Sequence, residues 1–214
     1  MKVLIAGANG GTGRNIIQIL SESGQHEPVA MIRDITQSAE LEQLGTKETV
    51  LADLEGELDH AVEGCDAVIF AAGSGSKTGP EKTVSVDEQG AINLIKSAEK
   101  HGVKRFIMLS TVGADNPEYG SGDMKHYFES KGKADKALRE STLDYTIVRP
   151  GALSNDAGNG RIQLAEKLGD YNGSIPREDV AKVMSECLNY KNTSRKTFEI
   201  LSGDQDITTA LKSV

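Results

Sequence analysis

Short apolar runs alternate with longer amphipathic segments along most of this chain. The apolar runs have the length of buried strands, and they lie at residues 3–6, 28–32, 49–51, 67–72, 106–109, 145–149 and 197–201. Segments of helical character lie between and after them, at residues 14–20, 39–44, 59–63, 87–101, 125–139, 175–181 and 207–211. This alternation predicts an α/β fold, a single doubly wound parallel sheet (Rossmann fold) with helices on both faces.

A glycine-rich turn, Gly-Ala-Asn-Gly-Gly-Thr-Gly at residues 7–13, connects the first apolar run to the first helix. Gly7 permits a tight turn, Gly10 lets the backbone approach a pyrophosphate, and Gly13 lets the helix pack closely on the strand. The helix start presents unpaired N–H groups and the positive end of its dipole, which suits a phosphate. The residues predicted to bind a dinucleotide here are Gly7, Asn9, Gly10, Gly11, Thr12, Gly13 and Arg14.

This turn resembles the glycine motif of extended and atypical short-chain dehydrogenases/reductases. Residues 87–106 are similar to the family pattern DxxGxxNLIxAAxxxGVKRF, residues 149–151 to its RPG, and residues 177–181 to its REDVA. The resemblance covers about residues 1–205 of the chain. It implies a Rossmann domain that binds a nicotinamide dinucleotide.

The end of the second predicted strand indicates which cofactor is bound. Arg33 and Asp34 come 20 and 21 residues after Gly13, where a dinucleotide-binding fold meets the adenosine ribose. Arg33, joined by Arg14, would accommodate a 2′-phosphate, which favours NADP(H). The alternative is that Asp34 bonds the 2′-hydroxyl of NAD(H), if the strand ends one residue later.

Further cofactor contacts are expected where the third and fourth strands end. By the family resemblance, Asp53 and its neighbour Leu54 lie against the adenine ring; the alternative is that Asp53 caps the next short helix. Ala71, Ala72 and Gly73 follow the fourth strand, and their small size leaves room for the cofactor to cross the sheet.

A YxxxK motif lies near the start of the helix that follows the fifth strand. Tyr127 and Lys131 are four residues apart, so they share one helix face. We expect the phenol to donate a proton to a carbonyl as hydride arrives, and the ammonium to lower the pKa of the phenol and to hold the nicotinamide ribose. By the resemblance, Thr111 or Ser110 supplies a hydroxyl that polarises the carbonyl, and Thr111 aligns better. The alternative is that Tyr127 only packs and Lys131 is a solvated charge.

The closing segment is expected to complete the site. Pro150 ends the sixth strand and frees the following loop to arch over the cofactor, and we expect Arg149 to pair with an acid at the sheet edge.

We assign residues 1–214 to one domain, with a small substrate-facing region around residues 151–175. The loop at residues 74–80 is either a lid that orders on binding or a simple connection.

These features predict an oxidoreductase that transfers hydride between NADP(H) and a small carbonyl or quinone-like substrate. An epimerase or dehydratase is less favoured, because the chain has no room for the usual additional substrate lobe. The rival hypothesis is a non-catalytic cofactor-binding redox sensor of the NmrA-like type. Such sensors lose the catalytic tyrosine, so the YxxxK motif favours the enzyme.

Composition excludes other classes of function. A net charge of −8 without a basic stripe argues against nucleic-acid binding. No apolar run is long enough for a membrane span, and the N-terminus enters a strand directly, so we expect a cytoplasmic protein that is a monomer or homodimer. Cys65 and Cys187 lie far apart and outside any CxxC, and the four histidines have no ligand-like spacing, so we expect no metal.

Overall fold

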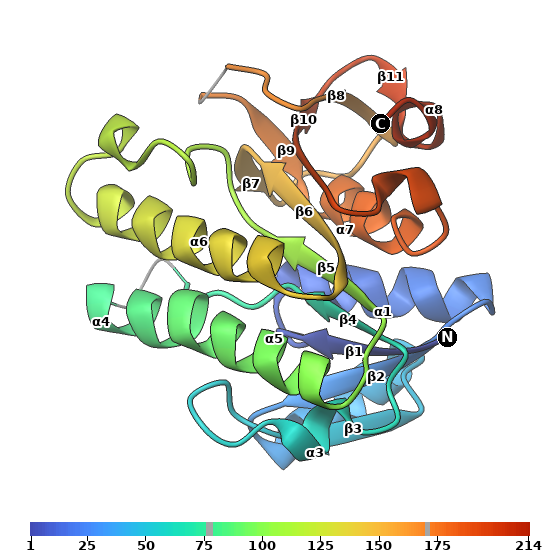
Figure 1. Cartoon of the computed structure of the whole chain (residues 1–214). Helices are drawn as coiled ribbons and strands as arrows, with labels where there is room; N and C mark the ends of the chain where they lie inside the picture. The colour runs from blue at the N-terminus through green and yellow to red at the C-terminus, as the bar shows by residue number, and fades with distance from the viewer. Residues whose placement is uncertain (76–78, 170–171) are drawn as a thin grey trace.

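The computed structural model describes residues 1–75, 79–169 and 172–214, and it has the expected α/β architecture (Figure 1). In this part of the chain nine strands form one sheet in the order β3-β2-β1-β4-β5-β6-β10-β8-β11, and β7 pairs with β9. The strands are β1 (Lys2–Ala6), β2 (Glu27–Ile32), β3 (Glu48–Leu51), β4 (Ala67–Phe70), β5 (Arg105–Leu109), β6 (Asp144–Pro150), β7 (Ala152–Ser154), β8 (Arg161–Ala165), β9 (Ser174–Pro176), β10 (Lys196–Ser202) and β11 (Gln205–Asp206).

The helices lie on both faces of this sheet. They are α1 (Gly11–Ser23), α2 (Ser38–Gln43), α3 (Asp59–Val62), α4 (Pro80–Lys82), the π-helix η2 (Thr83–Gly90), α5 (Ala91–Lys100), α6 (Asp123–Glu140), α7 (Arg177–Glu186) and α8 (Ile207–Lys212), with 3₁₀ turns η1 (Ile35–Gln37), η3 (Pro117–Tyr119) and η4 (Lys191–Thr193). Helices α1 and α7 pack together on one face, while α5 and α6 cover the other (Figure 1).

The core forms two layers because successive strand side chains point to opposite faces. In β1, Val3 and Ile5 join the cluster that contains residues of α1 and α7, whereas Leu4 and Ala6 join the cluster that contains residues of α5 and α6. Strands β1 to β6 and β10 pair in parallel, and only β8 and β11 add antiparallel pairs. Burial on both faces explains why the sequence shows continuous apolar runs in place of alternation.

The structure contains strands that the apolar pattern did not predict. Strands β7, β9 and β11 have two or three residues each, and β8 has five. They are short, so hydrophobic periodicity does not detect them. Within the expected substrate-facing region, β7 and β9 pair with each other and β8 extends the main sheet.

The long helix begins earlier than the predicted residue 87. A π-helical segment, η2, runs from Thr83 to Gly90 and leads directly into α5. Its first residues, Thr83-Val84-Ser85-Val86, include three β-branched residues with low helix propensity, which hid the helix start. This segment places Asp87 and Glu88 in buried positions.

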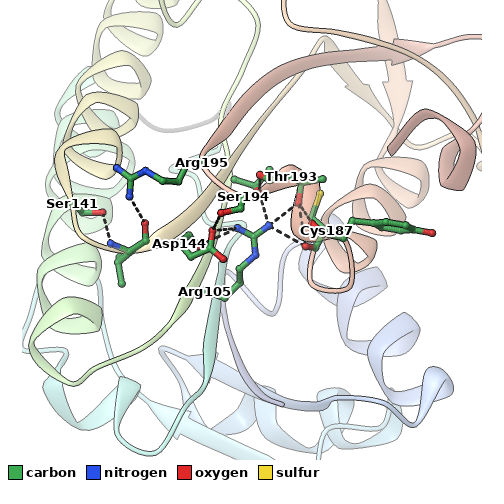
Figure 2. A network of polar contacts seen from close by, with 10 residues as sticks. Arg105, Ser141, Asp144, Cys187, Thr193, Ser194 and Arg195 are labelled. Atoms are coloured by element: carbon green, nitrogen blue, oxygen red, sulfur yellow. Dashed lines mark hydrogen bonds and ion pairs between the residues drawn. The ribbon is translucent and has the colours of Figure 1, made fainter. Parts of the chain in front are cut away.

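A buried arginine, Arg105, connects the C-terminal part of the chain to the first residues of β5 and β6 (Figure 2). The Arg105 guanidinium, on the first residue of β5, donates to the Asp144 carbonyl (3.1 Å), to Thr146 Oγ1 (2.5 Å), to the Cys187 carbonyl (3.0 Å) and to Thr193 Oγ1 (2.8 Å). It also forms an ion pair with Asp144 Oδ1 at 3.2 Å. We call these five residues the Arg105 cluster. It joins the beginnings of β5 and β6 to the end of α7 and to η4.

Candidate functional site

The glycine turn lies where the strand order reverses, between β1 and β4. Gly7 has a φ of +85°, and a Cβ placed there would lie 2.5 Å from the Ala72 nitrogen. A Cβ on Gly13 would lie 2.2 Å from the Gly7 carbonyl oxygen, so only glycine lets α1 pack this closely. No side chain caps the α1 N-terminus at Gly10. The turn therefore presents backbone N–H groups and the helix dipole at the carboxyl edge of the sheet.

A cavity of about 390 Å³ opens beside this turn. Its lining includes nine of the predicted cofactor residues: Gly7, Asn9, Gly10, Arg33, Asp53, Leu54, Ala71, Ala72 and Gly73. Gly11, Thr12, Gly13, Arg14, Lys131 and Pro150 are predicted residues that are not in this lining. The cradle of glycine backbone, the uncapped helix and the small residues after β4 fit a dinucleotide.

Three charged side chains near the end of β2 differ in their freedom to bind a ribose phosphate. Arg33 lines the cavity, and no ion pair or hydrogen bond of its guanidinium is found within residues 1–75, 79–169 and 172–214. Arg14 is engaged elsewhere, because it donates to the Asn9 side chain at 2.5 Å and pairs with Glu40. Asp34 accepts hydrogen bonds from the Thr36 backbone N–H and hydroxyl at 2.9 and 2.8 Å, which lower the pKa of its carboxyl.

The segment after β3 forms another part of the cavity wall. Asp53 does not cap α3, because the N-cap of that helix is Leu58. The Asp53 carboxylate accepts a hydrogen bond from the Glu55 N–H at 3.0 Å. Lys82, which also lines the cavity, donates to both oxygens of Glu55 at 2.9 and 2.8 Å. This ion pair connects α4 to the segment after β3.

Tyr127, Lys131 and Thr111 are brought together at the carboxyl end of β5. Tyr127 is half-buried, and the Thr111 hydroxyl interacts with its phenol. Lys131 is only 2% exposed, and its ammonium donates to the Leu109 carbonyl at 2.6 Å. The ammonium also lies 5.7 Å from the centroid of the Phe70 ring and 3.8 Å from Asp87 Oδ1. Lys131 is therefore a buried, partnered cation and not a solvated charge.

The pKa of the Tyr127 phenol is raised, whereas the sequence analysis expected it to be lowered. Burial, followed by the negative charges of Asp87 and Asp135, raises the pKa of Tyr127 above its ordinary value, and the Thr111 hydroxyl opposes this only weakly. Tyr127 is therefore a neutral phenol, suited to donate a proton.

A second buried ion pair lies beside these groups. Arg149 donates from Nε and Nη2 to Asp135 Oδ2 at 3.0 and 2.9 Å, and its Nη1 lies 3.4 Å from Asp115 Oδ2. Its principal partner is thus a helix residue of α6 and not the expected acid at the sheet edge. Burial raises the pKa of Asp135, while Arg149 and Ser110 oppose that rise. Ser110 therefore faces Asp135, and Thr111 faces Tyr127.

Sequence reasoning missed several residues of the site. Ser74, Lys82 and Gln37 line the cavity, and Asp87 faces Lys131 behind its wall. Asp87 had a signal as the first residue of the pattern quoted at 87–106, and Ser74 belongs to the loop at 74–80 that was expected to be a lid or a simple connection. The others arrive through loops and short helices whose shape is set by tertiary contacts. Residues 76–78 of the expected lid lie outside the described residues.

The described residues offer neither a metal site nor a membrane span. Among the described residues, no group of three or more histidine, cysteine, aspartate and glutamate side chains is arranged to hold a metal ion. No helix of the described chain is both long and apolar enough to cross a membrane.

Known proteins share this sequence and fold. A family model described as NAD(P)H-binding matches residues 7–191. The chain is 44% identical over 217 residues to the uncharacterised sugar epimerase YhfK of Bacillus subtilis, with 100% of both chains covered. It is 46% identical, with a TM-score of 0.97 and 100% of both chains covered, to the structure of a proposed NAD-dependent epimerase/dehydratase from Bacillus halodurans. It is 32% identical to the oxidoreductase ylbE from Lactococcus lactis, with a TM-score of 0.88 over 100% of this chain and 96% of that one.

Proposed function

Because the chain belongs to the NAD(P)H-binding Rossmann family related to atypical short-chain dehydrogenases/reductases, we propose that it is an NADPH-dependent reductase of a small carbonyl or quinone-like substrate. The observation that carries this proposal is the group of Tyr127, Thr111 and Lys131 next to the dinucleotide cavity. Asp87 connects this group to the cavity wall, since it contacts both Lys131 and the backbone of Ser74, which lines the cavity. The description of a 32% identical relative as an oxidoreductase supports the same reaction class.

The residues of this chain divide the work of such a reaction. Backbone N–H groups at residues 7–13 and the α1 N-terminus would hold the pyrophosphate. When bound, the reduced nicotinamide supplies a hydride to the carbonyl carbon and becomes oxidised. Tyr127 donates the proton that the substrate oxygen needs, and the Thr111 hydroxyl polarises that oxygen. Lys131 fixes the local structure through the Leu109 carbonyl.

The test of this role is Tyr127→Phe in an assay of NADPH oxidation with a panel of aldehydes and quinones. Loss of the phenol hydroxyl should lower kcat by about 10²–10⁴-fold, because general acid catalysis contributes that much. The dissociation constant for NADPH should change by less than about 2-fold. Tyr119→Phe is the matched control, since Tyr119 is an exposed tyrosine in the turn before α6. Full activity in Tyr127→Phe would overturn the assignment of the proton donor.

The same assay separates the proposal from its rivals. An epimerase returns the hydride to its own substrate and therefore causes no net oxidation of NADPH. Conversion of a sugar without net NADPH oxidation would favour the activity in the name of the 44% identical relative. A redox sensor would bind NADPH and oxidise none with any substrate of the panel. Steady NADPH oxidation that depends on Tyr127 supports only the reductase.

We also propose that Arg33 selects NADP(H) over NAD(H). Arg33 lines the cavity, whereas the Asp34 carboxylate accepts hydrogen bonds from Thr36. Arg33→Ala should weaken NADPH binding by about 10–100-fold, because a hydrogen bond to a charged group contributes about 1.5–3 kcal/mol. NADH binding should be unchanged. Arg14→Ala is the control, and because Arg14 is held by Glu40 it should cost less than about 3-fold. Tighter binding of NADH than of NADPH by the unmodified protein would refute this selection.

A further inference from the structure

The side chain of Arg177 lies against the glycine turn. Arg177 is the first residue of α7, the helix that packs on α1, and its side chain is half-buried. A Cβ on Gly11, the first residue of α1, would lie 2.9 Å from Arg177 Cδ and 3.5 Å from its Nε. The absence of a side chain on Gly11 therefore lets the arginine lie across the first turn of α1. The backbone N–H groups of that turn would hold the pyrophosphate.

The Arg177 guanidinium has neutral partners. Its Nη1 donates to the Leu153 carbonyl at 3.2 Å and to Asn155 Oδ1 at 2.7 Å. In the part of the chain that the structure describes, no carboxylate forms an ion pair with this guanidinium, and Nε and Nη2 make no hydrogen bond. Nε and Nη2 are therefore donors that a ligand can use.

The acids that follow Arg177 on α7 have other partners. Glu178 Oε2 accepts the Gly158 N–H at 2.9 Å, and Asp179 Oδ1 accepts the Gly160 N–H at 2.8 Å. Arg177 itself occupies the N-terminal end of α7, where the helix dipole disfavours a cation. The stability of α7 therefore does not explain an arginine at this position.

Positive groups from α1 and α7 thus meet beside the dinucleotide cavity. The α1 N-terminus has no side-chain cap at Gly10, and the α7 N-terminus has none at Pro176. Arg177 is not in the cavity lining, but Gly10, the neighbour of Gly11, is. A dinucleotide in a Rossmann fold presents its pyrophosphate to the first helix, and guanidinium groups bind phosphate oxygens through charge-assisted hydrogen bonds.

We propose that Arg177 binds the pyrophosphate of the cofactor through Nε and Nη2, from the side opposite to the backbone N–H groups of the glycine turn. The proposal rests on the proposed function, in which this site binds NADP(H). Arg33 and Arg177 then divide the phosphates of the cofactor, because Arg33 binds the 2′-phosphate and Arg177 the pyrophosphate. Through Leu153 and Asn155, Arg177 also connects the cofactor to the substrate-facing region.

The experiment is a calorimetric titration of the purified protein with four probes. NADPH, NADH and ADP-ribose contain the pyrophosphate, whereas adenosine 2′-monophosphate contains only the 2′-phosphate. Arg177→Ala should weaken binding of the first three by about 10–100-fold, the range for a hydrogen bond to a charged group. Its affinity for adenosine 2′-monophosphate should stay within about 2-fold. Arg33→Ala should weaken binding of NADPH and adenosine 2′-monophosphate and leave NADH and ADP-ribose unchanged.

Two further variants make the titration specific. Arg161→Ala is the matched control, because Arg161 also donates from Nη1 to a carbonyl, that of Asp204, at 2.7 Å. It lies on β8, which β10, β6, β5 and β4 separate from β1, so all four affinities should stay within about 2-fold. Arg177→Gln covers the case in which Arg177→Ala does not fold, since the glutamine amide removes the charge and keeps an N–H donor. It should show the same selective loss.

Other patterns would overturn the proposal. An equal loss of adenosine 2′-monophosphate binding in the Arg177 variants would indicate that this arginine only supports the fold of the site. Unchanged affinity for NADH and ADP-ribose would also overturn it, and a raised KM of the acceptor would then assign the guanidinium to an anionic group of the substrate. Full activity of Tyr127→Phe would instead refute the proposed function and leave the binding pattern intact, so the two failures are distinguishable.

Discussion

Strand β5 carries a buried charged cluster at each of its ends, and the two are built differently. At its first residue is the Arg105 cluster, in which the guanidinium has carbonyl, hydroxyl and carboxylate partners. Beyond its last residue is the Lys131 cluster, which we define as Asp87, Tyr127, Lys131, Asp135 and Arg149. In that cluster Oδ1 of Asp87 and of Asp135 lack hydrogen bonds within the described chain.

The difference agrees with a division in which one end stabilises the fold and the other carries the proposed chemistry. An unpaired buried polar group costs about 1–3 kcal/mol, so two such groups are not explained by stability. They lie at the carboxyl ends of parallel strands, where open α/β sheets bind ligands. The satisfied cluster lies at the opposite edge and holds α7 and η4 against β5 and β6 (Figure 2).

The largest expected effect comes from breaking the satisfied cluster. Arg105→Met should lower the free energy of unfolding by about 3–5 kcal/mol, because it leaves the Cys187 carbonyl and the Thr146 and Thr193 hydroxyls without their donor. Urea unfolding followed by circular dichroism measures this change. Arg139→Met, at an exposed position on α6, should change stability by less than about 0.5 kcal/mol.

The NADPH affinity of the same variant tests whether the Arg105 cluster takes part in cofactor binding. The folded fraction of Arg105→Met should keep its NADPH affinity within about 2-fold, since the Arg105 cluster lies at the edge of the sheet away from the cavity. A large loss of NADPH affinity with unchanged stability would contradict the division of roles.

A smaller effect is expected on the thiol of Cys187. This side chain is fully buried, and burial raises the pKa of the thiol to about 12. It should therefore react with an aromatic disulfide only through local opening. Arg105→Met removes the hydrogen bond to the Cys187 carbonyl and should accelerate the reaction by about 10-fold or more.

Two controls keep the thiol measurement specific. Cys65 packs in the other core layer, and its reaction, measured in Cys187→Ser, reports global unfolding. In Cys65→Ser, Asp87→Asn should leave the Cys187 rate unchanged within about 2-fold. Equal acceleration by Asp87→Asn and Arg105→Met would show that the two clusters open together.

The sequence was sufficient for the elements that are continuous in the chain. The apolar runs predicted the parallel strands, because both faces of the sheet are covered. The glycine spacing predicted the tight turn at Gly7 and the close packing at Gly13, since both are local steric requirements. The YxxxK motif of Tyr127 and Lys131 follows the fifth apolar run in the chain. Its place in the sequence therefore predicted that these residues lie near the end of β5.

Contacts between distant segments could not be predicted in this way. The Asp87–Lys131 pair joins residues 44 positions apart and depends on a π-helix whose β-branched start conceals it. The raised pKa of Tyr127 follows first from burial and then from the charges of Asp87 and Asp135, which the sequence alone does not bring together. The sequence analysis expected Arg14 to contact the 2′-phosphate of the cofactor. In the structure α2 places Glu40 against Arg14, and the two side chains form an ion pair.

The smallest effect is expected at a third charged group, which is partly exposed. Asp59 on α3 pairs with Lys100 and accepts from the Ser97 hydroxyl at 2.9 Å, and these contacts lower the pKa of its carboxyl to about 2. Because the folded-state pKa is below the unfolded value of 3.8, this stabilisation is complete above about pH 4 and is lost as the pH falls towards 2. The difference in stability between the unmodified protein and Asp59→Asn should therefore be constant from pH 7 to 5. It should shrink between pH 4 and 2, as measured by urea midpoints. Asp204→Asn, at an exposed acid without an ion pair in the described chain, should show no such pH dependence. A difference that persists unchanged to pH 2 would show that Asp59 acts through packing and not through its charge.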